Sequence, residues 1–205
     1  MNQALALLEF SSVATGVLAV DRMLKRSPVA LLRCGTVHPG RYLALVGGSV
    51  AATEEAHAEG GLVGSQQGAL VDEVCLADPH PALAAALGGH RHEPEHEAAG
   101  ILEISTSPAM LRAVDAVLKS VPVNLVEIRL ADDLGGRSVA VISGRLPDVQ
   151  EGLELAGRSV GSCGELLGAS LLPTVDETLR RVLAVGTRFA SCQSWEPAEA
   201  ETVED

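Results

Sequence analysis

The residues best suited to chemistry in this chain are its histidines and cysteines. His38 stands directly before Pro39-Gly40, a pair typical of a turn, so its imidazole is expected at the tip of a loop. The cysteines are far apart and form no CxxC pair: Cys34, Cys75, Cys163 and Cys192. This spacing argues against a zinc knuckle or a thioredoxin-type site within one chain and favours buried or free thiols in a reducing compartment.

Three further histidines, His90, His92 and His96, lie in the segment GGHRHEPEHEAAG between Gly88 and Gly100. Imidazoles bind metal when the fold holds them in a fixed geometry. This segment has no apolar period and is rich in Gly, His and Glu. It is therefore expected to be an exposed linker between domains, with no metal.

Enzyme chemistry is not expected from this sequence. It contains no Ser/His/Asp order, phosphate-binding glycine loop, HExxH motif or paired carboxylates. The stretch GGSVAA at Gly47 is typical of a strand end that meets a helix.

The elements that must position these residues occur twice. VDRMLKRSPV, residues 20–29, returns 94 residues later as VDAVLKSVPV, residues 114–123, and Leu8-Glu9 returns as Leu102-Glu103. Such a repeat indicates a tandem duplication of a module of somewhat under 100 residues. We expect a first domain over residues 1–88, a linker over 89–99, a second domain over 100–189 and a tail over 190–205.

Each module predicts the same order of elements. ALALLEF (4–10) and GILEIS (100–105) are short buried strands that lead into a capped helix, with Pro108 expected at the first helical position of the second copy. A hairpin follows, then a helix (50–58 and 147–156), a strand and a short closing helix. Strand, helix, strand, strand, helix, strand is the ferredoxin-like split βαβ arrangement, an α+β fold whose antiparallel sheet carries its helices on one face.

Composition limits the partners. Net charge is −12 and the sequence pI about 4.9, without a basic stripe to neutralise phosphates, so nucleic acid is not expected. No run is long and apolar enough to span a membrane, and a cytoplasmic location is expected. The acidic tail after Ala190 is expected to be disordered. With 47% hydrophobic but only 2% aromatic residues, the cores must use Ala, Val, Leu and Ile.

Taken together, these motifs resemble the bacterial microcompartment shell proteins of the tandem-domain kind. The resemblance is carried in both repeats by LE(F/I)-S in the first strand, the helix ending xVDxxLK, the proline after it, and a Gly-Arg hairpin entering a strand that ends in glycine. It implies a homotrimer that forms a flat pseudohexameric tile. Such tiles pack with shell hexamers and pentamers around encapsulated enzymes, and small metabolites pass through a central pore.

The resemblance also implies site residues. Lys25 and Lys119, near the end of the first helix of each repeat, would lie at the tile edge and meet their counterparts in a neighbouring tile. The pore would be lined by the turn of each hairpin: Val37, His38, Pro39 and Gly40 in repeat one, and Asp133, Leu134, Gly135 and Gly136 in repeat two.

In one member type of this family a cysteine precedes Pro-Gly in the first turn, and three such cysteines hold a [4Fe-4S] cluster on the threefold axis. This chain has His38 there instead, and Cys34 lies four residues earlier. We therefore expect no cluster and a collar of His38 side chains, which could hold a metal such as Zn²⁺ at the threefold axis. Two alternatives stay open: a metal- or redox-carrying pore tile, and a ferredoxin-like trimeric sensor that binds a small ligand.

Overall fold

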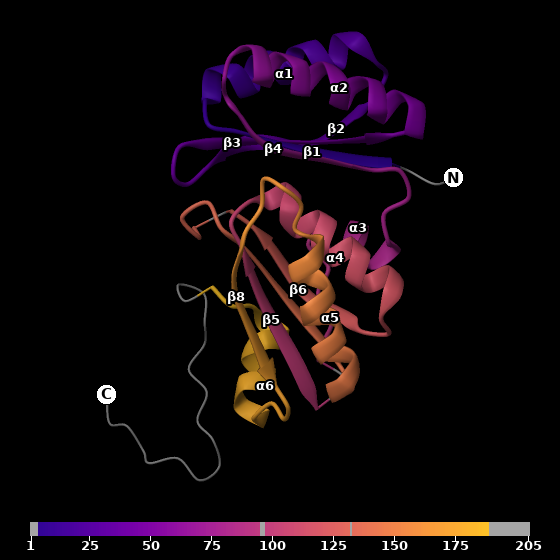
Figure 1. Cartoon of the computed structure of the whole chain (residues 1–205), viewed down its shortest axis with the longest axis vertical. Coiled ribbons are helices and arrows are strands. Elements are labelled where there is room, and N and C mark those ends of the chain that lie inside the picture. Colours follow the sequence, from indigo (N-terminus) through magenta and orange to yellow (C-terminus); the bar gives the residue numbers. More distant parts are fainter. Residues whose placement is uncertain (1–3, 95–96, 132, 189–205) are drawn as a thin grey trace.

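The computed structural model describes residues 4–94, 97–131 and 133–188, which fold as two repeats (Figure 1). Repeat one consists of β1 (Ala4–Phe10), α1 (Val13–Arg26), β2 (Ala30–Val37), β3 (Arg41–Gly48), α2 (Val50–Gln66), β4 (Leu70–Leu76) and α3 (Pro81–Leu87). Repeat two consists of β5 (Ala98–Ile104), α4 (Ser107–Ser120), β6 (Asn124–Leu130), β7 (Ser138–Gly144), α5 (Leu146–Ser159), β8 (Leu166–Leu172) and α6 (Glu177–Val185). The predicted α+β fold, duplicated in tandem, is confirmed.

Both repeats form a four-stranded antiparallel sheet with the same strand order. It is β2-β3-β1-β4 in repeat one and β6-β7-β5-β8 in repeat two. The strand that opens each repeat is therefore an inner strand, paired on both sides. All seven residues of β1 are buried, as its apolar pattern, broken only by Glu9, predicts for a strand covered on both faces.

The first helix of each repeat begins at a side-chain cap. Ser12 accepts a hydrogen bond from Thr15 N in repeat one, and Thr106 accepts one from Ala109 N in repeat two. Ser107 takes the first helical position of α4, so Pro108 stands second and the expected position was wrong by one residue. The helix ends at Ser120, before Pro122, as predicted.

The second helix of each repeat is longer than the sequence suggested. α2 runs to Gln66, eight residues beyond the expected end, because its glycines are packing positions and not a stop signal. A Cβ atom on Gly60 would lie 2.7 Å from Met23 Sδ, and one on Gly64 would lie 2.8 Å from Phe10 Cε1. The glycines thus let the helix lie close against α1 and the sheet, at the cost of some helix propensity.

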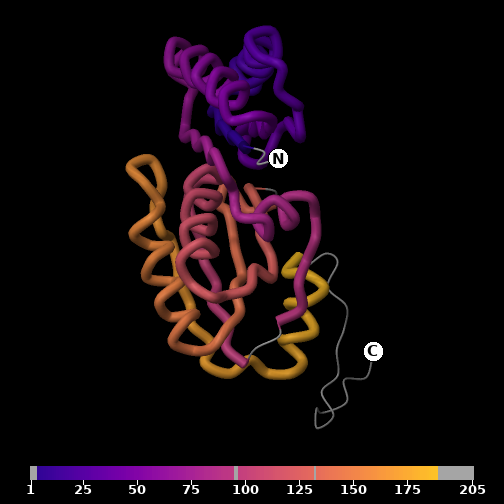
Figure 2. The backbone as a smooth tube through the Cα atoms, turned by 90° about the vertical axis from the view of Figure 1, so that its right-hand side faces the viewer, coloured from indigo at the N-terminus to yellow at the C-terminus, as the bar shows by residue number. Residues whose placement is uncertain are grey.

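The two repeats lie one beyond the other, and they share a core (Figures 1 and 2). Helices α1 and α2 cover one face of the first sheet and enclose an apolar cluster with it. The opposite face of that sheet packs on α4 of repeat two. No helix among the described residues is long and apolar enough to cross a membrane.

The segment between the repeats is more ordered than a free linker. Arg91 Nη2 lies 2.5 Å from Glu127 Oε1 of β6, and His92 N donates to Val126 O at 3.4 Å. Pro94 is buried, and β5 already begins at Ala98, inside the expected linker. Residues 88–93 are nevertheless exposed, as expected of a linker, and His96 lies outside the described residues.

Candidate pore turns and the interface between repeats

The two turns predicted to line a pore lie against each other. Residues 38–40 join β2 to β3, and the turn that contains residues 133–136 joins β6 to β7. A Cβ atom on Gly136 would lie 3.1 Å from Pro39 Cδ, so the turns are in direct contact. Gly136 also has φ of +84°, a conformation that glycine adopts without steric cost.

Most side chains of these turns face solvent. The exposed turn residues are His38, Pro39, Gly40, Asp133 and Gly135, whereas Val37 and Leu134 are half-buried and Gly136 is buried. The structure thus brings the two predicted groups together at one side of the molecule, where the two repeats meet (Figure 1). Their place around a pore stays a prediction, because one chain would form only part of the ring.

An arginine directly after each turn binds a glutamate of the inner strand. Arg41 Nη1 pairs with Glu9 Oε1, and Arg137 Nη1 lies 2.9 Å from Glu103 Oε1. These pairs tie the base of each turn to the centre of its sheet. Glu9 is fully buried, and burial raises the pKa of its carboxyl although Ser107 and Arg41 donate hydrogen bonds that oppose the shift.

Polar contacts connect repeat one to the start of α4. Glu9 Oε2 accepts from Ser107 N at 2.8 Å, which satisfies one of the open N–H groups of the helix. Asp72 Oδ2 accepts from Thr106 Oγ1 at 2.6 Å, and Arg112 Nη2 lies 3.4 Å from Asp72 Oδ1. Arg112 also donates to Glu73 O at 2.8 Å. Carboxylates from β1 and β4 therefore receive the N-terminal part of the second repeat's first helix.

A second carboxylate contact lies further along α4. Asp115 Oδ1 accepts from His80 N at 2.7 Å, at the cap of α3, and Asp115 Oδ2 accepts from Lys119 Nζ at 2.6 Å. Its counterpart Asp21 bonds Lys25 Nζ at 2.7 Å and has no such contact with a short helix in the described chain. The duplicated motif thus performs an interface role in one repeat and remains exposed in the other.

Apolar packing completes this contact, which we call the internal interface: the outer face of sheet one together with α3, packed on α4 and β6. Five side chains of repeat one join the core of repeat two: Leu7, Leu43, Leu45, Val74 and Leu83. On the side of repeat two, α4 is buried over most of its length.

The two candidate edge lysines are both exposed. The side chain of Lys25 is 71% exposed and that of Lys119 is 42% exposed, and each pairs with the aspartate four residues earlier. Their positions on the surface are compatible with a tile edge, and that role stays a prediction.

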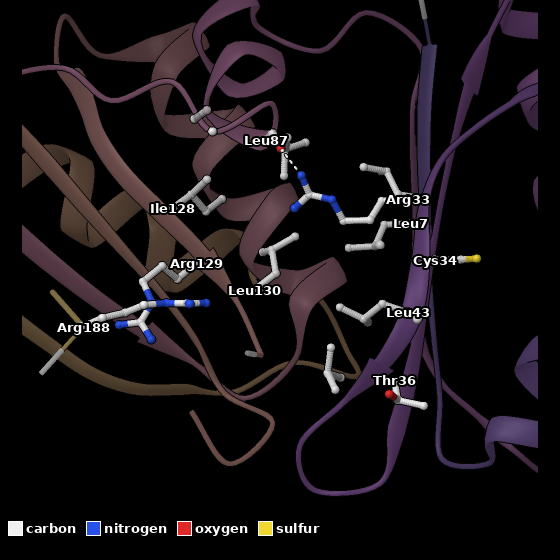
Figure 3. Close-up of a pocket in the computed structure, with 15 residues that line it drawn as sticks. Leu7, Arg33, Cys34, Thr36, Leu43, Leu87, Ile128, Arg129, Leu130 and Arg188 are labelled. Carbon is white, nitrogen blue, oxygen red and sulfur yellow. Dashed lines mark hydrogen bonds between the residues drawn. The ribbon is translucent and has the colours of Figure 1, made fainter. Parts of the chain in front are cut away.

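The thiols do not gather at the turns. Cys34 lies in the middle of β2 with its side chain directed away from the cavity between the repeats (Figure 3). A hydrogen bond with Cys34, together with burial, raises the pKa of Tyr42 to about 12. Burial raises the pKa of the Cys75 thiol, Cys163 is exposed, and Cys192 lies outside the described residues.

The described histidines of the connecting segment make ordinary contacts. His90 Nδ1 lies 3.1 Å from Ala85 O, and the side chain of His92 is exposed. Within residues 4–94, 97–131 and 133–188, no group of three His, Cys, Asp or Glu side chains in one chain is arranged to hold a metal ion.

Comparison with known proteins identifies the repeats. The family model of the BMC domain matches residues 4–79 and again residues 98–175, the two repeats just described. This chain belongs to the bacterial microcompartment shell proteins. Its role is structural, and its place is the shell of a microcompartment.

Relatives of known name agree with this assignment. The shell protein PduT of Citrobacter freundii is 33% identical over 186 residues, which cover 91% of this chain and all of that protein. The carboxysome assembly protein CcmO of Synechocystis is 31% identical over 198 residues, 91% of this chain and 66% of that protein.

Solved structures show the same fold. A microcompartment protein of Desulfitobacterium hafniense superposes with a TM-score of 0.73 at 29% identity, over 88% of this chain and 99% of that one. A fused, permuted hexameric shell protein from the RMM microcompartment has a TM-score of 0.53 at 16% identity, over 77% and 83% of the two chains, and supports the fold alone. Shell proteins are structural, so the family favours a role without catalysis.

The carboxylates of the internal interface were missed in the sequence. Glu9 stands inside the apolar strand ALALLEF, and Asp72 and Asp115 also lie in largely apolar surroundings. A charged residue in the middle of a buried strand is itself a signal, because burying a charge is costly unless a partner compensates it. The sequence motif LE was noted only as part of a repeat, and its partner, 98 residues away, was not visible there.

Proposed function

We propose that three copies of this shell protein close into a pseudohexameric tile, with the paired turns around a central pore for small metabolites. The internal interface supports this proposal, because both of its surfaces occur a second time on the chain and are left uncovered there by residues 4–94, 97–131 and 133–188. A chain that carries two complementary surfaces on opposite sides forms either a closed ring or an open filament. With two similar wedges per chain, three chains complete a ring of six.

The first free surface is α1, the counterpart of α4. Val17 is 52% exposed, whereas its counterpart Leu111, 94 residues later, is 1% exposed beneath repeat one. Leu24 is 41% exposed and Leu118 only 8%. An apolar helix face that is covered in one repeat and open in the other is the expected mark of a contact that another chain completes.

The second free surface is the outer face of sheet two with α6, the counterpart of sheet one with α3. Leu83 of α3 is fully buried in the internal interface, whereas its counterpart Leu179 of α6 is 40% exposed. Ile101 of β5, the counterpart of the buried Leu7, is only half-buried. The two free surfaces therefore match the two sides of the internal interface.

Polar counterparts are present on the same free surfaces. Glu103 occupies the position of Glu9, so it would accept a hydrogen bond from Val13 N at the start of a neighbour's α1, as Glu9 does from Ser107 N. Asp21 would likewise receive the N–H of Asp176 at the cap of a neighbour's α6, as Asp115 receives His80 N. Each contact between chains would repeat a contact observed within one chain.

One part of the polar contact is not repeated. In the sheet of repeat two Glu103 lies opposite Gly168, whereas in repeat one its counterpart Glu9 lies opposite Asp72. In α1, Leu18 occupies the position that Arg112 has in α4. The salt bridge between Asp72 and Arg112 therefore belongs to the internal interface alone. Interfaces between chains would be more apolar, which is common where chains stay permanently associated.

Size and surface substitutions test the trimer. Native mass spectrometry should give three times the chain mass of 21.2 kDa. Val17→Asp should yield a folded monomer, because it places an unpaired carboxylate in the contact between chains while leaving the fold of one chain intact. Leu62→Glu is the matched control: Leu62 is also 52% exposed, and its counterpart Arg158 remains exposed in the complete chain. A monomeric wild type, or a trimer that tolerates Val17→Asp, would contradict the proposal.

The turn residues do not suit an iron–sulfur cluster. Such clusters are held by thiolates, whereas the turn supplies the imidazole of His38, and Cys34 is directed away from the cavity between the repeats (Figure 3). We therefore propose a polar collar of His38 side chains. Shell hexamers, shell pentamers and encapsulated enzymes are the proposed partners of the assembled tile, with Lys25 and Lys119 at its edges.

A further inference from the structure

We propose that the open edge of β2 binds the segment that follows α6 in the neighbouring chain, residues 189–205. This inference rests on the proposed trimer and goes beyond it, because it names the occupant of a strand that the contacts between chains described so far leave uncovered. The segment lies outside the described residues, and the observations that point to it come from β2 and its counterpart β6.

Strand β2 is exposed, whereas β6 is buried. Leu31 and Leu32 of β2 are 39% and 51% exposed. Their counterparts 94 residues later, Leu125 and Val126 of β6, are 1% and 0% exposed. Both strands lie at the edge of their sheets, where backbone N–H and C=O groups are open to pairing with another segment. An apolar edge strand that is covered in one repeat and open in the other indicates that something outside the described chain covers it.

The segment that follows α3 covers the edge of β6. His92 N donates to Val126 O at 3.4 Å, and Arg91 Nη2 lies 2.5 Å from Glu127 Oε1. Glu127 is only 1% exposed as a result. The chain that leaves repeat one therefore crosses the edge strand of the next repeat.

The segment that follows α6 is the sequence counterpart of the segment that follows α3. Gly89-His90-Arg91 returns 97 residues later as Gly186-Thr187-Arg188, and Phe189 then stands in the place of His92. In the proposed ring, the repeat that follows repeat two is repeat one of the neighbouring chain. The N–H of Phe189 would therefore donate to Leu32 O on the neighbour's β2, which repeats the contact of His92 within one chain. Such addition of a segment to a sheet edge is a common mode of protein association.

The aromatic residues of the segment suit the apolar part of β2. The chain has one Trp, one Tyr and two Phe residues, and both Phe189 and Trp195 lie in residues 189–205. Aromatic side chains bury a large apolar area, so these two can cover Leu31 and Leu32.

The charges are complementary as well. Arg33 is exposed and occupies the position that Glu127 has in β6, so its charged partner has to be acidic. Within the chain, Arg33 Nη2 donates to the carbonyl of Leu87 at 3.3 Å, which leaves its charge to be paired by a carboxylate (Figure 3). Arg188 carries the same charge as Arg33, so the carboxylate has to come from the residues after it. These contain no Lys or Arg, and their acidic members are Glu196, Glu199, Glu201, Glu204 and Asp205.

Trp195 is the single tryptophan of the chain, so its fluorescence reports on this segment alone. In the trimer, its emission should lie at shorter wavelength and be quenched less by acrylamide than in the Val17→Asp monomer, because binding to β2 removes the indole ring from water. Native mass spectrometry of the same samples gives the number of chains. A monomeric wild type would overturn the tile and this contact together, whereas a trimer whose Trp195 is quenched as strongly as in the monomer would overturn this contact alone.

Charge reversal locates the contact on β2. Arg33→Glu should raise the quenching of Trp195 to the level of the monomer while the trimer remains. Adding Glu196→Arg and Glu199→Arg to that variant should restore the protection. Arg158→Glu, which reverses an exposed arginine of α5, is the matched control and should change nothing. Unchanged protection in Arg33→Glu, or an equal loss in the control, would overturn the proposal.

Mixed trimers show which chain supplies the segment. Arg33→Glu chains that keep Trp195 are co-expressed with an excess of Trp195→Phe chains, so that fluorescence comes only from chains whose own β2 is altered and whose neighbours have an intact one. A segment bound to the neighbour predicts a protected Trp195. An exposed Trp195 in the mixed trimers would mean that the segment binds β2 of its own chain, and it would overturn the proposal.

Discussion

The duplicated aspartates, Asp115 and Asp21, offer a direct test of the interface argument, because the same motif faces two different surroundings. Asp115 is 5% exposed and bonds both His80 N and Lys119 Nζ, whereas Asp21 bonds Lys25 in solvent. Replacing Asp115 by Ala leaves the His80 N–H without its acceptor, at about 1–3 kcal/mol, and removes an ion pair of about 0.5–1 kcal/mol. The expected loss in unfolding free energy is about 1.5–4 kcal/mol. The expected loss for Asp21→Ala is only about 0.2–0.5 kcal/mol, the value of an exposed helical pair.

The measurement needs a monomeric chain, so that dissociation does not mix with unfolding. Both variants should be made in the Val17→Asp background and unfolded with urea. In the chain with native Val17, the order should reverse for assembly: Asp21→Ala weakens the trimer because the N–H of Asp176 of a neighbour loses its acceptor. Equal unfolding free energies for the two monomeric variants would refute the stabilising role assigned to Asp115. An Asp21→Ala trimer as stable as wild type would refute the correspondence between internal and external contacts.

Three further predictions follow from the described residues. Glu9→Gln keeps an oxygen that can accept the hydrogen bond from Ser107 N. Because burial raises the pKa of Glu9 in the folded state, the unfolding free energy of the wild type should rise relative to that of this variant as pH falls from 7 toward 4.5. Urea unfolding at several pH values measures this difference, and a difference that does not change with pH contradicts the shift. Lys25→Ala with Lys119→Ala should abolish sheets in electron micrographs while the trimer remains, since exposed lysines contribute under about 1 kcal/mol to a fold; loss of the trimer would place them inside the tile. Elemental analysis of anaerobically purified protein should find no stoichiometric iron and sulfide, and any bound zinc should be weak; brown protein, or tight zinc that His38→Ala abolishes, would overturn the collar.

The repeat allowed much of the fold to be predicted, because an element that is ambiguous in one copy can be assigned from the corresponding residues of the other copy. Strand β1 was predicted with the bounds that the structure has, and the hairpins followed from glycine turns between apolar runs. The end of α2 was wrong because Gly60 and Gly64 are required by close packing against residues remote in sequence. Propensity alone cannot separate a glycine that ends a helix from one that lets another element approach.

Only the parts of the candidate site that have a counterpart in the family's sequence motifs could be predicted. The turns were placed from the Gly-Arg hairpins, and the structure brings both turns together. The contact of Glu9 with Ser107, and the cavity that Arg33 and Arg129 line from opposite walls, depend on how the two repeats pack. That packing is encoded in apolar surface shape, to which no local motif corresponds.

The close contact of Pro39 with Gly136 has a consequence for how such a chain can vary over generations. A side chain on Gly136 would be strained by its φ of +84° and would also press on the ring of Pro39, so a change at Gly136 is easier to accommodate when residue 39 changes as well. After the duplication each copy was in principle free to diverge. At these two positions the copies instead depend on each other, so substitutions at positions 39 and 136 should co-vary among homologous sequences.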